Sequence, residues 1–314
     1  MPSALFTLTL NPAIDRTLTI HGFTVGAVNR VELANDRAGG KGINVAATLV
    51  ALGYPVASLG FLGRDNAAIF NTLFAQLGIE DRCLRLPGST RVGIKIFDPR
   101  SGATTDINFP GLSPAPADVE ALRGQLAELG GAGDCCVLAG SLPPGVAPEV
   151  YPELIAMLKA RGVRTVVDTS GTALRAALQA APDIIKPNQA ELEALVGRSL
   201  PTEAAVIAAA RVLVAGGVRL VVVSRGADGA CFVTADRVVV ARPPTVTVGS
   251  TVGAGDAMVA GVVAAQLRRA TLADTARHAT ACSLAVLTCA ATETGVALRD
   301  RVAAFEPRVA LSPA

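Results

Sequence analysis

The sequence contains no tryptophan, only two tyrosines and two histidines, and aromatic residues make up 4% of its 314 positions. Proteins that hold single-stranded nucleic acid commonly stack the bases on aromatic side chains, so this composition gives such a role little support. Charge points the same way, because 28 basic and 26 acidic residues leave a net charge of +2. We therefore expect no nucleic-acid partner.

Neither the cysteines nor the apolar runs suggest a metal or membrane protein. The six cysteines form no Cys-x-x-Cys pair, and with so few histidines a zinc site is not expected. The apolar run 257–267 is too short to span a bilayer, and the first ten residues show no signal-peptide pattern. We expect a cytoplasmic protein with no membrane partner and with reduced thiols. The cysteines are Cys83, Cys135, Cys136, Cys231, Cys282 and Cys289.

Hydrophobic residues make up 51% of the chain and charged residues 17%, which suits a globular protein with a large core. From residue 117 onward helical and strand patterns alternate, which predicts βαβ units around a mostly parallel sheet. Such sheets bind ligands beyond the carboxyl ends of their strands. Polar residues and glycines recur at these predicted strand ends and favour one active rim: Asn11, Ser141, Asp168, Lys186, Asn188, Ser224 and Gly226.

Two β-rich segments interrupt this alternation. Residues 12–36 include a β-like run at 25–33, and residues 89–110 resemble a hairpin with strands at 92–97 and 104–109. We expect the two segments to form one small sheet that projects from the core. The predicted domains are an α/β core of residues 1–11, 37–88 and 111–314, and a small sheet of residues 12–36 and 89–110.

A glycine-rich segment, TVGAGDAMVAG at 251–261, leads into a helical pattern. A helix N-terminus presents unpaired N–H groups and a partial positive charge, and Gly253 and Gly255 would let an anion approach that backbone closely. Asp256 follows in the first turn, where it could take the proton of a hydroxyl that attacks a phosphoryl group. Spacing alone equally allows an ordinary helix start with a capping aspartate.

A second glycine turn, RAGGKGIN at 37–44, opens another helical pattern. It is not a Walker A loop, because Lys41 is not followed by serine or threonine and the spacing differs. Taken alone, it equally allows a tight turn with a solvated lysine. Arg91 precedes the predicted hairpin and by itself is best interpreted as a surface charge.

Together these motifs resemble those of the PfkB/ribokinase family of sugar kinases. The resemblance covers essentially the whole chain, from LTLNP at 8–12 through GKGIN at 40–44 and GSLP at 140–143 to the segment 251–261. It implies a ribokinase-like, three-layer αβα core with a mostly parallel sheet and a small β-sheet lid. In that family the residue matching Asp256 is the catalytic base. The backbone N–H groups that match Gly253, Ala254 and Gly255 form an anion hole.

The resemblance also implies substrate, nucleotide and metal sites. The substrate positions match Asp15, Gly40, Lys41, Asn44, Arg91 and Ser141. The nucleotide positions match Lys186, Asn188, Ser224, Gly226 and Gly229, and Glu191 is expected to hold Mg²⁺ through water. The implied cofactors are therefore ATP and Mg²⁺. Arg225 stands where close relatives often carry leucine, and it either touches a phosphate or is solvated.

The implied activity is phosphorylation of a small-molecule sugar phosphate by ATP. Lys41 and Arg91 would supply cations for a phosphate that the substrate already carries. Overall resemblance favours fructose 1-phosphate, phosphorylated at its 6-hydroxyl, while tagatose 6-phosphate and fructose 6-phosphate stay open. A catalytically silent sugar- or nucleotide-binding regulator is the other alternative, which the intact Asp256 with its glycines disfavours. The resemblance further implies a homodimer formed through the lid.

Overall fold

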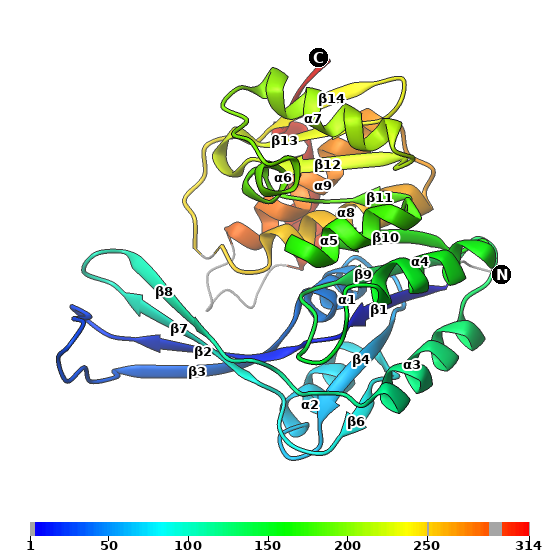
Figure 1. Cartoon of the computed structure of the whole chain (residues 1–314). Helices are drawn as coiled ribbons and strands as arrows, with labels where there is room; N and C mark the ends of the chain where they lie inside the picture. The colour runs from blue at the N-terminus through cyan, green and yellow to red at the C-terminus, as the bar shows by residue number, and fades with distance from the viewer. Residues whose placement is uncertain (1–3, 250, 289–296, 314) are drawn as a thin grey trace.

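The computed structural model describes residues 4–249, 251–288 and 297–313, and it contains two separate β-sheets (Figure 1). The strands of the larger sheet are β1 Leu5–Thr9, β4 Ala57–Gly63, β5 Glu80–Asp81, β6 Leu84–Leu86, β9 Cys135–Ala139, β10 Arg164–Asp168, β11 Ile184–Ile185, β12 Leu220–Ser224, β13 Ala230–Val233, β14 Val238–Arg242 and β15 Ala310–Pro313. Their order is β15-β14-β13-β12-β11-β10-β9-β1-β4-β5, and β6 pairs with β4. The pairs from β12 to β5 are parallel, and β13, β14 and β15 add an antiparallel edge.

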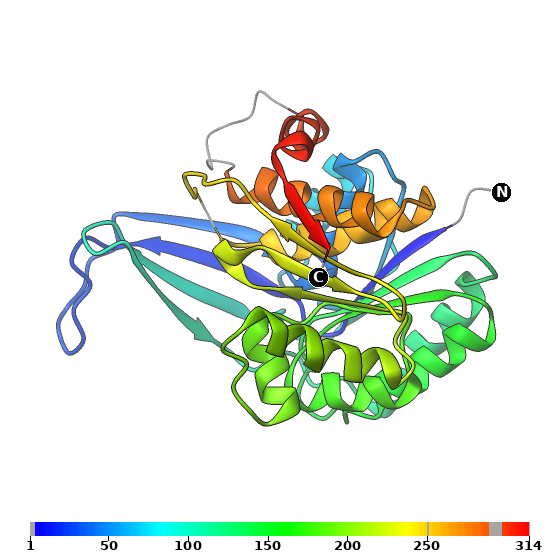
Figure 2. The ribbon, with the colours of Figure 1, turned by 90° about the horizontal axis from the view of Figure 1, so that it is seen from above.

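Helices cover both faces of the larger sheet, which makes a three-layer αβα core (Figure 2). One face carries α1 Lys41–Ala51, α2 Ala68–Leu77, α8 Ala254–Leu267, α9 Leu272–Leu287 and α10 Leu298–Phe305. The other carries α3 Pro116–Leu129, α4 Val150–Ala160, α5 Gly171–Ala177, α6 Gln189–Val196 and α7 Glu203–Ala215. The predicted α/β class with a mostly parallel sheet is confirmed.

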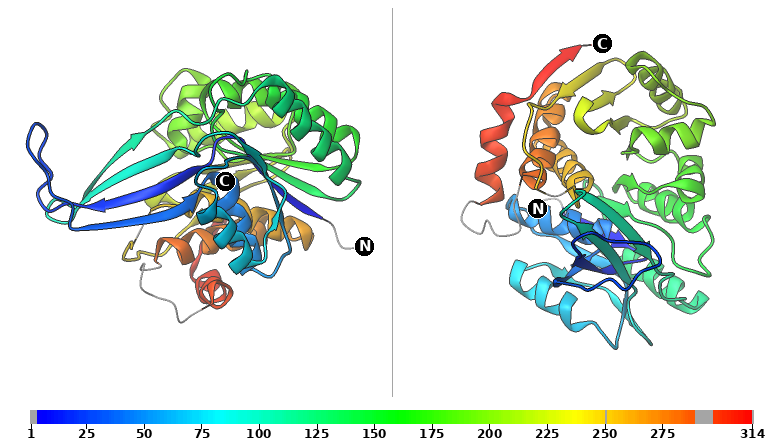
Figure 3. Two further views of the ribbon diagram at one scale, coloured as in Figure 1. Left: turned by 90° about the horizontal axis from the view of Figure 1, so that it is seen from below. Right: turned by 90° about the vertical axis from the view of Figure 1, so that its left-hand side faces the viewer.

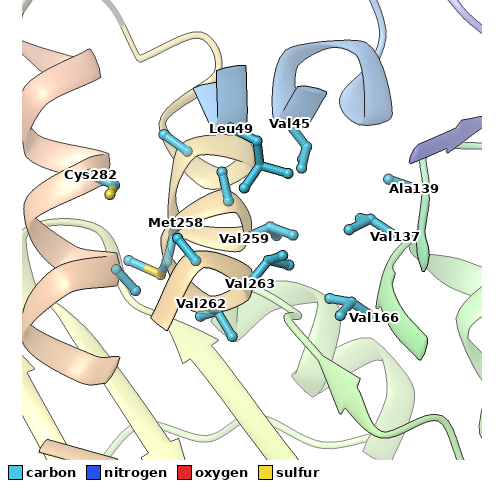
Figure 4. Packing of buried hydrophobic residues seen from close by; sticks show 14 of the residues in the cluster. Val45, Leu49, Val137, Ala139, Val166, Met258, Val259, Val262, Val263 and Cys282 are labelled. Atoms are coloured by element: carbon cyan, nitrogen blue, oxygen red, sulfur yellow. The ribbon is translucent and has the colours of Figure 1, made fainter. Parts of the chain in front are cut away.

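The alternation of side chains along the strands divides the core into two halves. In β9, Val137 and Ala139 belong to the hydrophobic cluster under α1, α8 and α9, whereas Cys136 and Leu138 belong to the cluster under α3 and α4. Successive side chains of a strand point to opposite faces, so an uninterrupted apolar strand is buried on both sides. Figure 4 shows Val137 and Ala139 on the side of β9 that faces α8. The core therefore holds α1 and α8 firmly against the sheet.

The smaller sheet projects from one side of the core (Figures 1 and 3). Its strands are β2 Ala13–Thr19, β3 Leu33–Gly39, β7 Val92–Asp98 and β8 Ala103–Asn108, in the order β3-β2-β7-β8. The expected hairpin is present as β7 and β8. The β-like run expected at 25–33 is wrong, because Val25 and Val28 are 89% and 86% exposed in a loop and β3 starts only at Leu33. Pairing with β2 extends β3 through the first glycine of the turn.

The helices α5 and α10 and the short strands β5, β6 and β15 were not predicted from the sequence. The two helices are short, with 7 and 8 residues, so each offers few turns in which a helical period can be recognised. β15 pairs with β14 at the edge of the larger sheet, and its residues are exposed or half-buried, so its sequence offers no clear apolar alternation. Cys289 lies outside the described residues.

Candidate active site

Two helices begin at the carboxyl edge of the larger sheet. α1 follows Gly40, which has a φ of 130°, and α8 follows Gly253, which has a φ of 81°. Side chains rarely adopt such angles, and a Cβ on Gly40 would lie 2.9 Å from Cγ2 of Thr9 at the end of β1. Glycine therefore lets α1 start directly against β1, with its N-terminus at the strand ends.

Asp256 and Asn44 connect the first turns of these two helices. Asn44 Nδ2 donates a hydrogen bond of 2.7 Å to Asp256 Oδ2, although the two residues lie 212 positions apart. The Asp256 residue is 7% exposed. The fold thus brings together two residues that the sequence placed in one site.

Asp168, the last residue of β10, is a buried carboxylate between two lysines. Lys41 Nζ lies 2.9 Å from its Oδ1, and Lys186 Nζ lies 3.4 Å from its Oδ2. Lys186 also borders the start of α8, because a Cβ on Gly255 would lie 3.5 Å from its Nζ. The sequence placed Asp168 at a strand end without giving it a role. Its position beyond a parallel strand was the signal available.

The environment of Asp256 favours its protonated form more than water does. Burial raises its pKa to about 6, and the negative charge of Asp168 acts in the same direction. The hydrogen bond from Asn44 and the charges of Lys41 and Lys186 lower this pKa. Asp256 is therefore mostly ionised at neutral pH while its proton affinity lies close to that pH, as a general base requires.

A cavity of about 460 Å³ lies between α8, α9 and the loops that follow β12 and β14. Ser224, Gly226 and Gly229 line it together with Ala254 and Gly255. Most of the remaining lining is apolar, as in many nucleotide and cofactor sites. A Cβ on Gly229 would lie 1.9 Å from the carbonyl oxygen of Ala241, so only glycine fits there. The residues expected in the nucleotide loop therefore share one cavity with the N-terminus of α8.

Asn188 and Glu191 form a capping box at the start of α6. Asn188 Oδ1 accepts from the Glu191 N–H, and Glu191 Oε2 accepts from the Asn188 N–H, both over 2.8 Å. The other oxygen, Oε1, lies 4.0 Å from Lys41 Nζ. Asn188 therefore caps α6, and Glu191 keeps one oxygen toward the cluster around Asp168.

The residues present fit a Mg²⁺ ion that is bound mainly through a nucleotide. Asp168 Oδ2 is buried and accepts no hydrogen bond from the described part of the chain, although Lys186 Nζ lies 3.4 Å away. Glu191 Oε1 shares Lys41 with Asp168. Within the described residues no group of three or more acidic, histidine or cysteine side chains is placed to hold a metal alone. Mg²⁺ commonly takes one or two carboxylates and completes its shell with phosphates and water.

A second cavity, of about 210 Å³, lies where the small sheet meets α1 and α8. Asp15, Arg37 and Lys95 line it from the small sheet, opposite Asn44 and Gly253. Asp15 pairs with Arg37 and Gly93 in register, and Lys95 Nζ lies 3.4 Å from Asp15 Oδ1. The sequence gave no role to Arg37 or Lys95, because only the strand register shows that they share a face with Asp15.

Arg91 and Ser141 lie together at another part of the rim, joined through Asn11. Arg91 Nη2 donates to the backbone oxygen of Asn11 over 3.5 Å, and Asn11 Nδ2 donates to Ser141 Oγ over 3.2 Å. Over the described ranges, no hydrogen bond or ion pair links these three residues to Asp256 or Asp168. They adjoin the base of the small sheet, since Arg91 Nη1 also donates to Asn108 Oδ1 over 3.4 Å.

The Arg225 side chain is largely buried and is paired within the protein. Its side chain is 10% exposed, and Nη1 donates to Glu203 Oε2 over 2.7 Å. Nε donates to Gln189 Oε1 over 3.3 Å. Arg225 therefore anchors the loop after β12 to the starts of α6 and α7.

The fold and the motifs at its strand ends define a carbohydrate kinase, which is a phosphotransferase. The model of the pfkB family carbohydrate kinases matches residues 8–298, and the chain belongs to this family. The chain is 50% identical to a 1-phosphofructokinase of Rhodobacter capsulatus over 288 residues, which cover 91% of each protein. It is 41% identical to a 1-phosphofructokinase of Escherichia coli over 313 residues, covering 100% of this chain and 99% of the relative.

Solved structures support the same family. Phosphofructokinase-2 from Escherichia coli in complex with fructose-6-phosphate matches with a TM-score of 0.88 and 30% identity, over 97% of this chain and 98% of the other. A possible 1-phosphofructokinase from Thermotoga maritima matches with a TM-score of 0.86 and 27% identity, over 99% of both chains.

In the part of this chain that the structure describes, every helix is too short or too polar to cross a bilayer.

Proposed function

We propose that this kinase transfers the γ-phosphoryl group of ATP to the 6-hydroxyl of fructose 1-phosphate, giving fructose 1,6-bisphosphate and ADP. The observation that carries the proposal is the identity of 50% and 41% with 1-phosphofructokinases over nearly the whole chain. The similarity to a phosphofructokinase bound to fructose-6-phosphate supports a hexose phosphate as the acceptor.

In this proposal Asp256 is the general base. As the 6-oxygen of the sugar attacks the γ-phosphorus, its proton passes to the Asp256 carboxylate, and the bond between the γ-phosphorus and the bridging oxygen of ADP breaks. Asn44 donates to Oδ2 over 2.7 Å, which fixes the carboxylate and leaves Oδ1 for the hydroxyl. The pKa of about 6 keeps Asp256 ionised at neutral pH.

Positive groups would neutralise the phosphoryl oxygens during transfer. The backbone N–H groups of Gly253, Ala254 and Gly255 form the N-terminus of α8 and supply the anion hole. Lys186 adjoins Gly255, and Lys41 is held by Asp168, so we place both lysines at this centre. When bound with ATP, Mg²⁺ would add further positive charge, with Asp168 and Glu191 as its protein carboxylates.

The remaining predicted residues would hold the two substrates. Ser224, Gly226 and Gly229 line the 460 Å³ cavity, which we assign to the nucleotide. Asp15, Gly40 and Ser141 would contact the sugar, and Arg91 would bind its phosphate through a bidentate guanidinium. These roles stay proposals, and each can be tested by substitution.

A coupled assay of ADP release tests the function directly. Fructose 1-phosphate, tagatose 6-phosphate, fructose 6-phosphate and unphosphorylated fructose are compared by kcat/KM at saturating ATP with Mg²⁺. We expect fructose 1-phosphate to give the highest value. A higher value for tagatose 6-phosphate would replace the substrate but keep the kinase. The absence of ADP release with all four sugars would favour a silent sugar- or nucleotide-binding regulator.

We also propose that two copies of the chain pair through the small sheet. Most exposed large apolar side chains in the described ranges lie on this sheet or its loops: Val25, Val28, Val31, Leu33, Phe97, Ile107 and Phe109. Exposed apolar groups of this extent commonly mark a protein–protein interface.

Because highly charged ATP and sugar phosphates cross membranes poorly, we propose that the enzyme works in the cytoplasm.

A further inference from the structure

A third cavity lies at the ends of α1 and α8 that are remote from Asp256. Its volume is about 340 Å³. It is lined by Leu52, Tyr54, Arg268, His278, Arg299, Val302, Ala303 and Glu306. Leu52 and Arg268 are the C-cap residues of α1 and α8, and a helix rises about 1.5 Å per residue. The cavity therefore lies roughly 20 Å from the N-terminus of α8, and none of its residues has a role in the proposed reaction.

The charge of this cavity suits an anion. It contains two arginines and one acid, Glu306, which is already bonded to His278 Nδ1 over 2.5 Å. Within the described residues the Arg268 side chain makes no hydrogen bond or ion pair, and the Arg299 side chain makes only a long contact of 3.5 Å with the Leu52 carbonyl oxygen. A guanidinium group can bind two oxygens of one phosphate through two parallel hydrogen bonds. Two arginines whose side chains lack an ion pair in the described ranges, around one cavity, therefore favour a phosphate-bearing ligand.

His278 supplies a second, independent observation. The residue is 6% exposed, and its Nε2 is buried without a hydrogen-bond partner. A buried polar atom without a partner is destabilising, and water or an ion commonly satisfies it. Burial lowers the pKa of His278, and Arg268 acts in the same direction, whereas Glu306 opposes it. A bound anion would favour the protonated, positively charged form of His278. Its Nε2–H could then donate a hydrogen bond to the anion.

The helices that end at the cavity are also the helices that carry the active-site pair. α1 and α8 are in contact, and Figure 4 shows Val45 and Leu49 of α1 on the side that faces Val259 of α8. Packing between α8 and α9 is tight, since a Cβ on Gly261 would lie 2.7 Å from Cα of Ala279, the neighbour of His278. Small shifts around His278 therefore cannot be absorbed between these helices.

We propose that this cavity binds a small phosphorylated metabolite through Arg268, Arg299 and His278, and that its occupation changes turnover through α1 and α8. The binding site is independent of the proposed function, whereas the effect on turnover rests on it. The site is separate from the nucleotide and sugar cavities, which lie at the opposite ends of the same two helices.

The low number of histidines allows a direct binding test. The chain has two, and the other, His21, pairs with Glu32 in a loop of the small sheet. Tag-free protein with ¹⁵N-labelled histidine is titrated with inorganic phosphate as the probe, against chloride at equal ionic strength. We expect a saturable shift of the His278 signal only, with His278→Gln used for its assignment. If phosphate moves neither signal, or moves both as chloride does, the site is excluded.

Variants separate this site from phosphate binding at the active site. The double variant Arg268→Ala/Arg299→Ala should weaken the apparent phosphate affinity reported by His278 about tenfold or more, because two charge-assisted contacts are lost. Arg277→Ala is the matched control, since Arg277 adjoins His278 in sequence but pairs with Asp274. Arg91→Ala should also keep the shift. An equal effect of Arg277→Ala, or loss of the shift in Arg91→Ala, would overturn the assignment.

Kinetics test the effect on turnover. Inorganic phosphate can also compete at the active site, so wild type and Arg268→Ala/Arg299→Ala are compared over one phosphate series at saturating substrates. We expect a phosphate-dependent change of kcat in the wild type that the double variant lacks. Identical responses of the two proteins would exclude the coupling. Wild-type activity without phosphate should match that of the double variant, because neither arginine touches the reacting groups. If neither protein phosphorylates any sugar, the proposed function fails, while the histidine titration still decides the binding site.

Discussion

Asp256 combines burial with a neighbouring negative charge, and both influences raise its pKa to about 6. Because a general base must be ionised and this pKa is that of the free protein, we expect kcat/KM to fall about tenfold per pH unit below this value. Asp168→Asn removes the neighbouring charge and should move the inflection to lower pH. The measurement is the pH profile of kcat/KM for both proteins. An inflection that stays in place in Asp168→Asn would contradict this account of the pKa.

Replacing Asp256 with asparagine should remove activity and stabilise the fold. Loss of a general base lowers kcat by about 10²–10⁴, whereas ATP and sugar binding should persist. The folded-state pKa is raised from 3.8 to about 6, so this carboxyl destabilises the folded state increasingly as the pH rises from 3.8 to 6, and fully above pH 6. The variant should therefore gain up to about 3 kcal/mol in free energy of unfolding at pH 8.

Unfolding by urea at several pH values measures this gain. The difference between Asp256→Asn and wild type should shrink as the pH falls through 6, because Asp256 then takes up its proton. A variant that is no more stable than wild type at pH 8 would contradict the raised pKa, and an unchanged kcat would contradict the role as base.

Arg91→Ala should raise KM for the sugar phosphate more than KM for ATP. Arg91 contacts Asn11 and Asn108 at the base of the small sheet, away from the 460 Å³ cavity. Loss of charge-assisted contacts with a phosphate weakens binding by roughly tenfold or more. Steady-state kinetics with each substrate varied in turn measures both constants. Equal increases in both would indicate general disturbance instead.

At the residue scale the sequence predicted the members of the site better than their contacts. Asn44 and Asp256 were both predicted as site residues, and their side chains form a hydrogen bond with each other. The roles of Asp168, Arg37 and Lys95 were missed, because they depend on which strands are neighbours and which side chains share a face. Asn188 was expected at the nucleotide, and its Oδ1 caps α6; its nucleotide role stays a prediction. All catalytic and binding roles remain predictions.

At the scale of elements, close packing of α8 and α9 depends on Gly261. An added Cβ would lie 2.7 Å from Cα of Ala279 and 3.0 Å from Sγ of Cys282. Alanine favours helices over glycine by about 1 kcal/mol, but here the two helices would have to separate. We expect Gly261→Ala to lower the free energy of unfolding by about 1–3 kcal/mol.

A matched control for this prediction is Gly124→Ala in α3, where nothing lies within 4 Å of the added Cβ. That variant should gain about 0.5–1 kcal/mol, because only helix propensity changes. Urea unfolding of both variants measures the difference. Equal stabilisation by the two substitutions would show that α8 and α9 tolerate the extra atom.

The elements that were predicted correctly are those with a long or uninterrupted apolar pattern. β9 and β12 are apolar and buried on both faces, and α8 is buried over most of its length. The misplaced strand, β3, shows the limit of this reasoning. Its residues are mostly exposed, so its position depends on pairing with β2 and not on an apolar period.

At the scale of the whole molecule, the sequence predicted the αβα core and a separate small sheet. The helix–strand alternation explains this success, because it requires a mostly parallel sheet covered on both faces. The sequence could not show that α1 and α8 have one end at the strand edge and the other at the cavity around His278. That relation follows only from the packing of segments far apart in the chain.

The projecting sheet provides the last prediction, which concerns assembly. The register places Leu33 and Phe97 on either side of Thr19 on one face, and their exposed fractions are 62% and 38%. An isolated small sheet with exposed apolar side chains gains stability when a second copy covers them. We expect the wild type to sediment as a dimer and Leu33→Glu/Phe97→Glu as a monomer. Val212→Glu, which changes a 67% exposed side chain on α7, should leave the dimer intact. A wild type that stays monomeric at all protein concentrations, or a double variant that still dimerises, would exclude pairing through this face.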